Sequence, residues 1–245
     1  MPEKPLDGRL AAVASFVRPG ARFADIGTDH AYLPIALIRT GTVSEAIATD
    51  LSDGPLSRAR KHIRESGMED CILTVKTDGL NGLENLGITD IAVCGMGGET
   101  IAEILSRADW IRTPDIRLIL QAMTMQEKLR RFLSEEGFRI EEETIGRSNG
   151  RLFPVFRCRY TGRSESLSEA DAYFGRSLLA QAGRLPLFGA YLEEKCASLE
   201  KILEGKRSAG LDTSREERLL SAVRPLRTEL PADANETERT STTHD

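Results

Sequence analysis

Four polar or glycine-containing segments stand directly after short apolar runs, where the loops of an α/β protein carry its chemistry. They are residues 25–30, Asp50, residues 77–79 and residues 95–98. An open parallel sheet binds its ligands beyond the carboxyl ends of its strands, so all four segments would meet at one edge. The preference of Gly and Asp for turns explains any one of them. Four in order, on consecutive strands, indicate a ligand site.

The spacing gives three of these residues a role toward a nucleoside cofactor. Gly27 has no Cβ, so the backbone there can approach the amino-acid part of the cofactor. Asp50, about 25 residues further on, stands where it would accept hydrogen bonds from both ribose hydroxyls. Asp78 stands where the adenine amino group would donate a hydrogen bond.

The charge of the first loop decides between two cofactors of this kind. A nicotinamide dinucleotide usually requires G-x-G-x-x-G after the first strand, because glycines let the backbone approach the pyrophosphate. Residues 25–30 read D-I-G-T-D-H, with one glycine and two carboxylates. Those carboxylates repel a diphosphate and suit the ammonium and sulfonium of S-adenosylmethionine. The predicted cofactor is S-adenosylmethionine, held by Asp25, Gly27, Thr28, Asp29, Asp50, Leu51, Asp78, Gly79, Cys94, Gly95 and Met96.

The elements that position these loops follow from the apolar pattern. Between about residue 8 and residue 160, short apolar runs alternate with helical spacing, which is typical of βαβ units. Strands are predicted at 22–26, 45–50, 72–76, 90–94 and 117–121, and a hairpin at 138–145 and 152–160 with a turn at 146–150. The predicted fold class is α/β, a Rossmann-like class I methyltransferase domain whose mostly parallel sheet ends in an antiparallel hairpin.

The pattern changes after residue 162. Helical spacing with many charges covers 170–182, 191–203 and 216–223, and Gly183, Pro186, Gly205 and Gly210 interrupt it. We therefore predict a methyltransferase domain at 1–162 and a small helical, coiled-coil-like domain at 163–226. Residues 227–245 are polar without an apolar pattern, and a disordered tail is expected there.

Three strings of residues resemble one family. Asp25–Pro34 (DIGTDHAYLP), Cys94–Gly98 (CGMGG) and Leu118–Gln121 (LILQ) resemble the bacterial TrmK family. The resemblance implies transfer of a methyl group from S-adenosylmethionine to N1 of the adenine at position 22 of tRNA, and it implies a small C-terminal coiled-coil domain. This chain differs from the family pattern at the expected entrance to the substrate site. The family pattern has Gln-Pro-Asn after the fifth strand, and this chain has Gln121-Ala122-Met123.

Three residues of the first loop and its helix are the catalytic candidates. Adenine N1 has an in-plane lone pair, so its methylation needs mainly alignment and exclusion of water. Asp29 would stabilise the cationic product or take a proton from N6, and its alternatives are a helix N-cap or a ligand for the cofactor ammonium. His30 would contact the substrate or satisfy the loop, and Tyr32 would stack on adenine or pack as a half-buried aromatic. The fourth-strand loop lacks the Asn-Pro-Pro-Tyr type of motif common in enzymes that methylate N6, which favours N1.

Several competing functions stay open at this point. A small-molecule methyltransferase would use the helical region as a lid or dimer contact, and a cofactor-binding interaction protein would not turn over. A nicotinamide reductase is the formal alternative. The net charge of −5 argues weakly against RNA, whose affinity would then come from local basic surface. The candidates are Arg9, Arg18, Arg22, Arg147, Arg151, Arg163, Arg176, Arg184, Lys195, Lys201, Lys206 and Arg207.

Composition limits the remaining possibilities. No two of the 4 cysteines form a C-x-x-C pair, and with 3 histidines no metal site is expected. No apolar run approaches the roughly 18 residues of a membrane span, and the start of the chain does not resemble a signal peptide. We expect a cytoplasmic monomer or weak dimer whose partner is tRNA.

Overall fold

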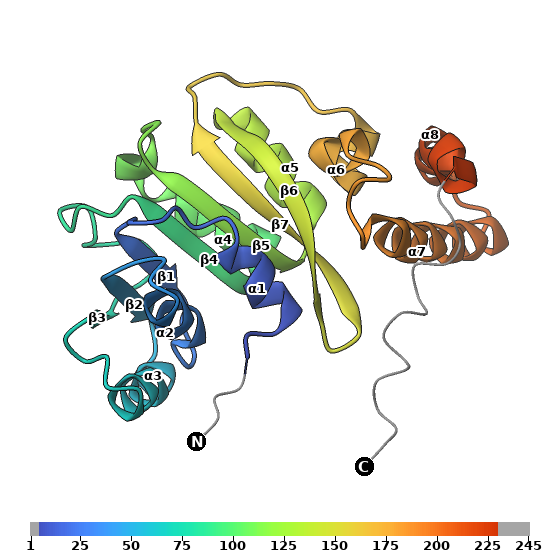
Figure 1. The fold of residues 1–245 in the computed structure, drawn as a ribbon. Helices are drawn as coiled ribbons and strands as arrows, with labels where there is room; N and C mark the ends of the chain where they lie inside the picture. Colours follow the sequence, from blue (N-terminus) through green and yellow to red (C-terminus); the bar gives the residue numbers. More distant parts are fainter. Residues whose placement is uncertain (1–4, 230–245) are drawn as a thin grey trace, which may run out of the picture. The chain divides into compact units, whose positions relative to one another are not determined.

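The structure, a computed structural model, describes residues 5–229, and a seven-stranded sheet lies at the centre of its first unit (Figure 1). The chain divides into two units, Met1–Ser166 and Leu167–Asp245. The strand order is β3-β2-β1-β4-β5-β7-β6, with β7 antiparallel to both of its neighbours and the other pairs parallel. The strands are β1 (Phe23–Ile26), β2 (Ala46–Asp50), β3 (Ile72–Lys76), β4 (Asp90–Gly97), β5 (Arg117–Thr124), β6 (Phe138–Ser148) and β7 (Arg151–Tyr160). The predicted fold class is confirmed.

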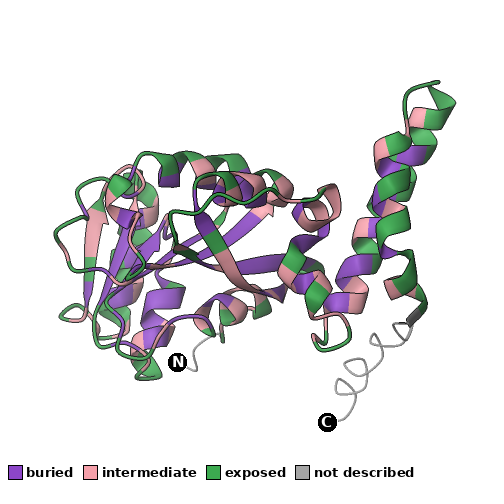
Figure 2. Ribbon diagram, turned by 90° about the horizontal axis from the view of Figure 1, so that it is seen from above, coloured by how far each residue is buried: buried purple, intermediate pink, exposed green. Residues whose placement is uncertain are grey.

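Apolar side chains alternate along the central strands and bury both faces of this sheet. In β1, Phe23 belongs to one buried cluster, whereas Ala24 and Ile26 belong to the other. Helices α1 (Gly8–Ala14), α2 (Tyr32–Arg39) and α3 (Asp53–Glu65) supply the first cluster, and α4 (Gly98–Ser106) and α5 (Gln126–Glu135) supply the second. A short 3-10 turn, Asp109–Ile111, precedes β5. Figure 2 shows the central strands as buried along most of their length.

The hairpin differs from the prediction at its turn. The turn contains only Asn149 and Gly150, at φ 49° and 74°, because Ser148 still pairs with Arg151. Two positive φ angles in an Asn-Gly pair are typical of the type I′ turn, whose twist matches that of the flanking strands. The predicted turn at 146–150 was therefore too long, and Gly146 belongs to β6.

Gly146 has a packing role instead of a turn role. A Cβ on Gly146 would lie 2.6 Å from the Cα of Arg9, and a Cβ on Gly8 would lie 2.7 Å from the carbonyl oxygen of Arg147. The two glycines thus let α1 cross β6 at backbone contact distance. Asp7 caps α1 by accepting from the Leu10 N–H at 2.8 Å. This close contact determines the position of α1, and with it the positions from which the α1 side chains extend.

A buried ion pair joins α5 to β6. Nε of Arg130 donates to Oε1 of Glu143 at 2.8 Å, and both side chains are only 1% exposed. The Arg130 guanidinium also lies over the Phe156 ring, 4.7 Å from its centroid. Burial removes water from both charges, so their attraction offsets part of the cost of losing that water.

The second unit is helical. It contains a π-helical turn (Asp171–Gly175), α6 (Arg176–Ala180), α7 (Phe188–Ser208) and α8 (Ser214–Glu229). Two predicted limits were wrong: α7 continues through Gly205, and α8 runs to Glu229, past residue 226, with Pro225 inside it. One glycine costs a helix about 1 kcal/mol, which the packing of α7 against α8 offsets. Residues 230–245 of the predicted tail lie outside the described residues.

Candidate active site

A cavity of about 510 Å³ opens at the carboxyl edge of the sheet and extends along α2. It contains eight of the predicted site residues: Asp25, Gly27, Thr28, Asp29, His30, Tyr32, Cys94 and Gly95. It does not include the other five: Asp50, Leu51, Asp78, Gly79 and Met96. Part of its wall comes from residues 5–7 and from α1, including Arg9. Arg9 was predicted only as an RNA contact, so its place in this wall was not expected.

The loop after β1 is held by its own backbone. The N–H groups of Gly27 and Thr28 both donate to the carbonyl of Thr49, at 2.9 and 2.7 Å. Gly27 has φ 77°, and a Cβ on it would lie 2.0 Å from Cε of Met96. Met96, near the end of β4, therefore packs directly on the loop after β1, in space that only glycine leaves. Met96 contacts the site through this packing although it does not line the cavity.

Asp25 is a buried carboxylate in β1, two residues before Gly27 and 8% exposed. Burial raises its pKa to about 6, although the Thr28 side chain and the charge of Arg9 act in the opposite direction. Burial and the neighbouring Asp25 also raise the pKa of the Cys94 thiol, which keeps it protonated. The cavity is thus lined by the carboxylate of Asp25, and neighbouring protein groups neutralise its negative charge only in part.

Asp29 points toward α3. Its Oδ1 accepts from Nε of Arg58 at 2.9 Å, and its Oδ2 lies 3.2 Å from Nε2 of His30. The residue that caps α2 is Ala31, at φ 54° and without a side-chain cap bond. The alternative reading of Asp29 as the helix N-cap is therefore wrong, because the chain reaches α2 through a left-handed residue.

Three aromatic rings cluster at the mouth of the cavity. The His30 ring stacks on Tyr32 and on His62, with centroid distances of 5.1 and 4.9 Å, and Tyr32 lies 5.4 Å from His62. Nδ1 of His62 is 3.2 Å from the carbonyl oxygen of His30. Tyr32 remains 45% exposed. His62 was not predicted as a site residue; it lies on α3 beside the buried Ile63, and its own residue type was the only signal in the sequence.

The predicted ribose and adenine ligands lie beside the cavity, following β2 and β3. These strands are parallel, and Asp50 is paired with Lys76 in their register, so both loops emerge at the same edge. Oδ1 of Asp50 accepts from the N–H of Ser52 at 2.7 Å, and Leu51 is exposed. Asp78 forms a two-point ion pair with Arg107, at 2.9 and 3.2 Å. A ligand at Asp78 must therefore share this carboxylate with Arg107.

Gly79, which follows Asp78, packs against the next helix. It has φ 61°, and a Cβ on it would lie 3.0 Å from Cγ2 of Ile104. The glycine thus allows the loop after β3 to pass closely over α4.

A buried glutamine connects α1 to the end of β4, where Gly95 lies within the strand although the sequence predicted a loop there. Oε1 of Gln121 accepts from Nη1 of Arg9 at 2.7 Å and from the N–H of Gly95 at 3.1 Å. Gln121 and the Ala122 that follows it are fully buried, and Nε2 of Gln121 lies 3.5 Å from Sδ of Met123. Ala122 and Met123, which replace the expected Pro-Asn, thus lie near the end of β5, next to the contacts of Gln121 with Arg9 and Gly95.

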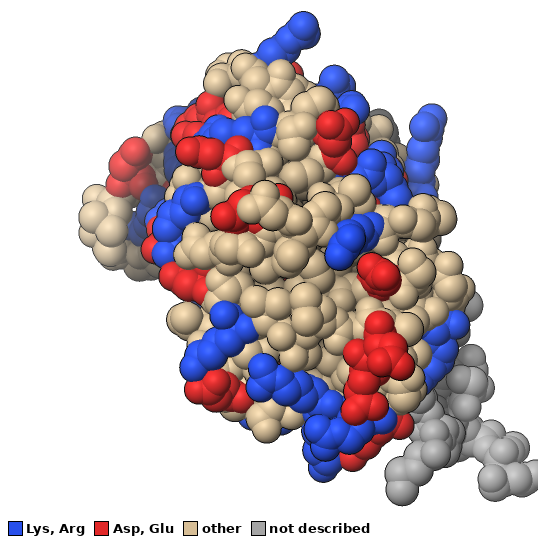
Figure 3. All heavy atoms as spheres, turned by 90° about the vertical axis from the view of Figure 1, so that its left-hand side faces the viewer, with Lys and Arg blue, Asp and Glu red and all other residues tan. Residues whose placement is uncertain are grey.

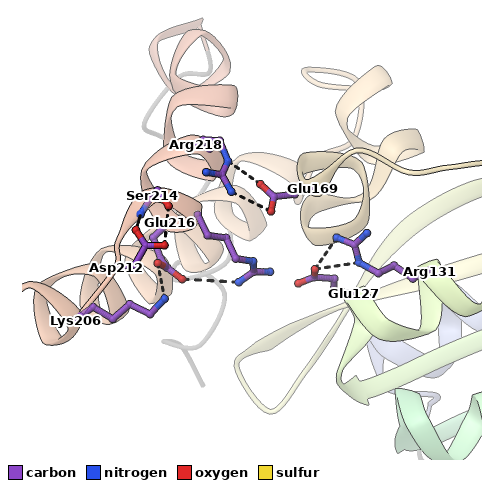
Figure 4. Close-up of polar contacts among 9 residues, drawn as sticks. Glu127, Arg131, Glu169, Lys206, Asp212, Ser214, Glu216 and Arg218 are labelled. Carbon is purple, nitrogen blue, oxygen red and sulfur yellow. Dashed lines mark hydrogen bonds and ion pairs between the residues drawn. The ribbon is translucent and has the colours of Figure 1, made fainter. Parts of the chain in front are cut away.

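Many candidate RNA-binding residues carry carboxylate partners. Arg18 donates to the fully buried Asp90, which makes it structural. Within the helical unit, Lys206 pairs with Glu216 and Arg207 with Glu217, and Arg176 pairs with Asp171. Figure 4 shows the Lys206–Glu216 pair and a similar one between Arg218 and Glu169. In Figure 3, basic and acidic side chains are interspersed over the face drawn.

Two kinds of site are absent from the described part of the chain. Over residues 5–229, no helix has both the length and the apolar character to cross a membrane. Among the same residues, no three His, Cys, Asp or Glu side chains gather in a way that could hold a metal ion.

The strand order, with β7 antiparallel between β5 and β6, and the loop beside Gly27 define a Rossmann-like methyltransferase domain. Residues 6–156 match a family model described as a methyltransferase domain. The tRNA (adenine(22)-N(1))-methyltransferase of Bacillus subtilis is 36% identical over 180 residues, which are 74% of this chain and 73% of that protein.

Two solved structures agree with these matches. The Bacillus subtilis M1A22 tRNA methyltransferase TrmK has a TM-score of 0.75 at 29% identity, covering 93% of this chain and 99% of that chain. A Streptococcus pneumoniae protein in complex with S-adenosyl-L-methionine has a TM-score of 0.76 at 31% identity, covering 88% and 100%. The chain therefore belongs to the TrmK family of tRNA (adenine(22)-N(1))-methyltransferases, and the resemblance stated above is confirmed.

Proposed function

We propose that this protein transfers the methyl group of S-adenosylmethionine to N1 of the adenine at position 22 of tRNA. One observation carries the proposal within the family: groups predicted for the cofactor, Asp25 and Gly27, line the same cavity as groups predicted for the base, His30 and Tyr32. A methyl transfer requires its two reactants in one enclosed space, and a single cavity meets that requirement.

The residues present fit the cofactor. The partly compensated carboxylate of Asp25 suits an ammonium group, and Gly27 lines the same cavity with its backbone. Asp50 stands at the end of β2 for the ribose hydroxyls, and Asp78 is the proposed adenine acceptor beside Arg107. The bound cofactor supplies an electrophilic methyl group on its sulfonium. Thr28, Asp29, Leu51, Gly79, Cys94, Gly95 and Met96 complete the proposed contact set.

The protein's part at the base is alignment. Adenine N1 attacks with its lone pair, so no proton needs to leave beforehand. Tyr32, backed by the His30 and His62 rings, offers a flat surface on which an extruded base can stack. Asp29 is the proposed group that stabilises the positive charge left on the methylated base, and Arg58 holds its carboxylate in place.

The fit with RNA rests on local basic groups, because the chain as a whole is acidic. Arg147 and Arg151 flank the hairpin turn on β6 and β7, and Lys195 and Arg215 lie near the Tyr173 ring in the helical unit. We assign the first unit to methyl transfer and the helical unit to tRNA contact, in the cytoplasm where tRNA substrates occur. A monomer or weak dimer stays a prediction.

The test combines S-adenosylmethionine labelled in its methyl group with unmodified bacterial tRNA, followed by nucleoside analysis. The expected result is label in N1-methyladenosine, lost when adenine 22 is replaced in the tRNA. A protein that binds the cofactor but leaves that tRNA unmethylated would contradict the proposal. Full activity on a small molecule without RNA, unaffected by salt, would instead indicate a small-molecule enzyme.

A further inference from the structure

Two opposite charges face the same cavity without pairing with each other. Asp25 lies on the floor, and the Arg9 side chain, only 17% exposed, enters from the α1 wall. Arg9 donates through Nη1 to the neutral amide of Gln121, and its Nε lies 3.9 Å from Asp7. A guanidinium has five N–H donors, so these two contacts leave donors for a ligand.

The position of Arg9 is built into the fold. Gly8 and Gly146 allow the backbone of α1 to contact β6, which brings the Cα of Arg9 against the strand. Oε1 of Gln121 accepts a hydrogen bond from the guanidinium and another from the N–H of Gly95, which restrains the guanidinium. A side chain fixed in this way loses little conformational entropy when a ligand binds. An arginine held only for stability would not require its guanidinium to border a cavity.

We infer that Arg9 binds the carboxylate of the cofactor's amino-acid end, so that Arg9 and Asp25 together form a site for a zwitterionic α-amino acid. The inference rests on the proposed function for the identity of the cofactor. An α-amino acid carries an ammonium and a carboxylate on one carbon, and it therefore requires one anion and one cation close together. Arg–carboxylate pairs are charge-assisted and directional, which makes guanidinium the suitable cation.

The test measures binding of two ligands that differ in one group. S-adenosylhomocysteine has the carboxylate, and S-adenosyl-3-thiopropylamine is the same molecule without it. Calorimetry without RNA gives the ratio of the two Kd values for the wild type, Arg9→Met and Arg22→Met. Arg22→Met is the matched control, because Arg22 is an exposed arginine near Glu45 and lies outside the cavity lining.

The wild type and Arg22→Met are expected to bind S-adenosylhomocysteine at least tenfold more tightly than the amine. In Arg9→Met the two Kd values should agree within about twofold. If Arg9→Met only disturbs the Gln121 contact, both ligands weaken together, the ratio survives and the inference is overturned. It is equally overturned if the ratio survives and Arg9→Met instead reduces the salt dependence of tRNA binding, because Arg9 would then bind an RNA phosphate.

The two proposals can fail separately. A preserved ratio with continued formation of N1-methyladenosine would overturn the role of Arg9 alone. A lost ratio without tRNA methylation would support the role of Arg9 and overturn the substrate assignment.

Discussion

Arg58 on α3 donates from Nε to Oδ1 of Asp29 at 2.9 Å, so the loop after β1 is tied to the helix after β2. Both side chains are at least half exposed, and an exposed pair of this kind contributes roughly 0.2–1 kcal/mol to stability. Its importance is therefore orientation of the Asp29 carboxylate at the mouth of the cavity.

Asp29→Ala should lower kcat about 100-fold while the Kd of S-adenosylhomocysteine changes less than about threefold, since the proposed role of Asp29 at the base outweighs its contact with the cofactor. Steady-state kinetics and calorimetry separate the two effects. Asp53→Ala is the control, because Asp53 is another exposed carboxylate with a cationic partner, Lys76. Equal losses in kcat and affinity would make Asp29 a cofactor ligand.

Cofactor binding should depend on pH through Asp25. Burial raises the pKa of this carboxylate to about 6, and only its charged form attracts the ammonium. The Kd of S-adenosylhomocysteine should therefore fall as the pH rises through about 6 and level off above about 7. Calorimetry across this range tests the prediction. Asp25→Asn should bind weakly and without this dependence, and a variant that keeps the wild-type profile would assign the titration to another group.

The same carboxylate should lower the stability of the ligand-free protein at neutral pH. Its pKa is about 6 in the folded state against an ordinary value of 3.8, so it favours folding fully below about 3.8 and loses that contribution as the pH rises through about 6. The difference of about two pKa units corresponds to about 3 kcal/mol. Asp25→Asn should thus raise the free energy of unfolding at pH 7 by up to about 3 kcal/mol, measured by urea titration. At about pH 3.5 the gain should vanish, and a gain of equal size there would contradict the prediction.

Gly27→Ala should lower affinity for the cofactor more than tenfold. The new Cβ would lie 2.0 Å from Cε of Met96, and φ 77° disfavours any L-residue by roughly 1–2 kcal/mol. Gly20→Ala is a close control, since Gly20 has φ 76° and no atom within 4 Å of an added Cβ. Thermal unfolding and cofactor Kd of both variants separate the backbone cost from the contact. Similar losses in the two variants would show that the contact with Met96 has no effect.

Glu143→Ala should destabilise the first unit by roughly 3–5 kcal/mol, because it removes the Glu143 carboxylate from beside the buried Arg130 charge. Urea titration measures the effect. Glu142→Ala on the same strand removes a partly exposed partner of Arg157 and should cost less than about 1 kcal/mol. Comparable effects of the two substitutions would argue that burial does not govern the Arg130–Glu143 pair.

The strands and the loops at their ends could be predicted because local patterns determine them. The apolar run ending in Asp50 is a strand whatever it packs against, and its parallel partners bring the loops to one edge. Asp25 and Gly27 share the cavity for this reason. The β6–β7 turn was misplaced because two glycines stand close together, and only pairing shows that Gly146 packs while Gly150 turns.

The parts of the site that could not be predicted depend on contacts between segments far apart in the sequence. Arg9 reaches Gln121, 112 positions away, only because α1 crosses β6. His62 reaches the carbonyl of His30 across 32 positions, and Asp78 meets Arg107 across 29. Sequence periodicity does not predict such contacts, because each depends on how the helices pack on the sheet.

The place of Asp25 on the cavity floor has a consequence for turnover. Together with Arg9 it would hold the amino-acid end of the cofactor, which methyl transfer leaves unchanged. S-adenosylhomocysteine keeps both contacts and loses only the positive charge on sulfur. Contacts that are equal before and after a reaction do not speed it up. These contacts slow the dissociation of S-adenosylhomocysteine. The rate of turnover would therefore depend on how quickly this product leaves the enzyme.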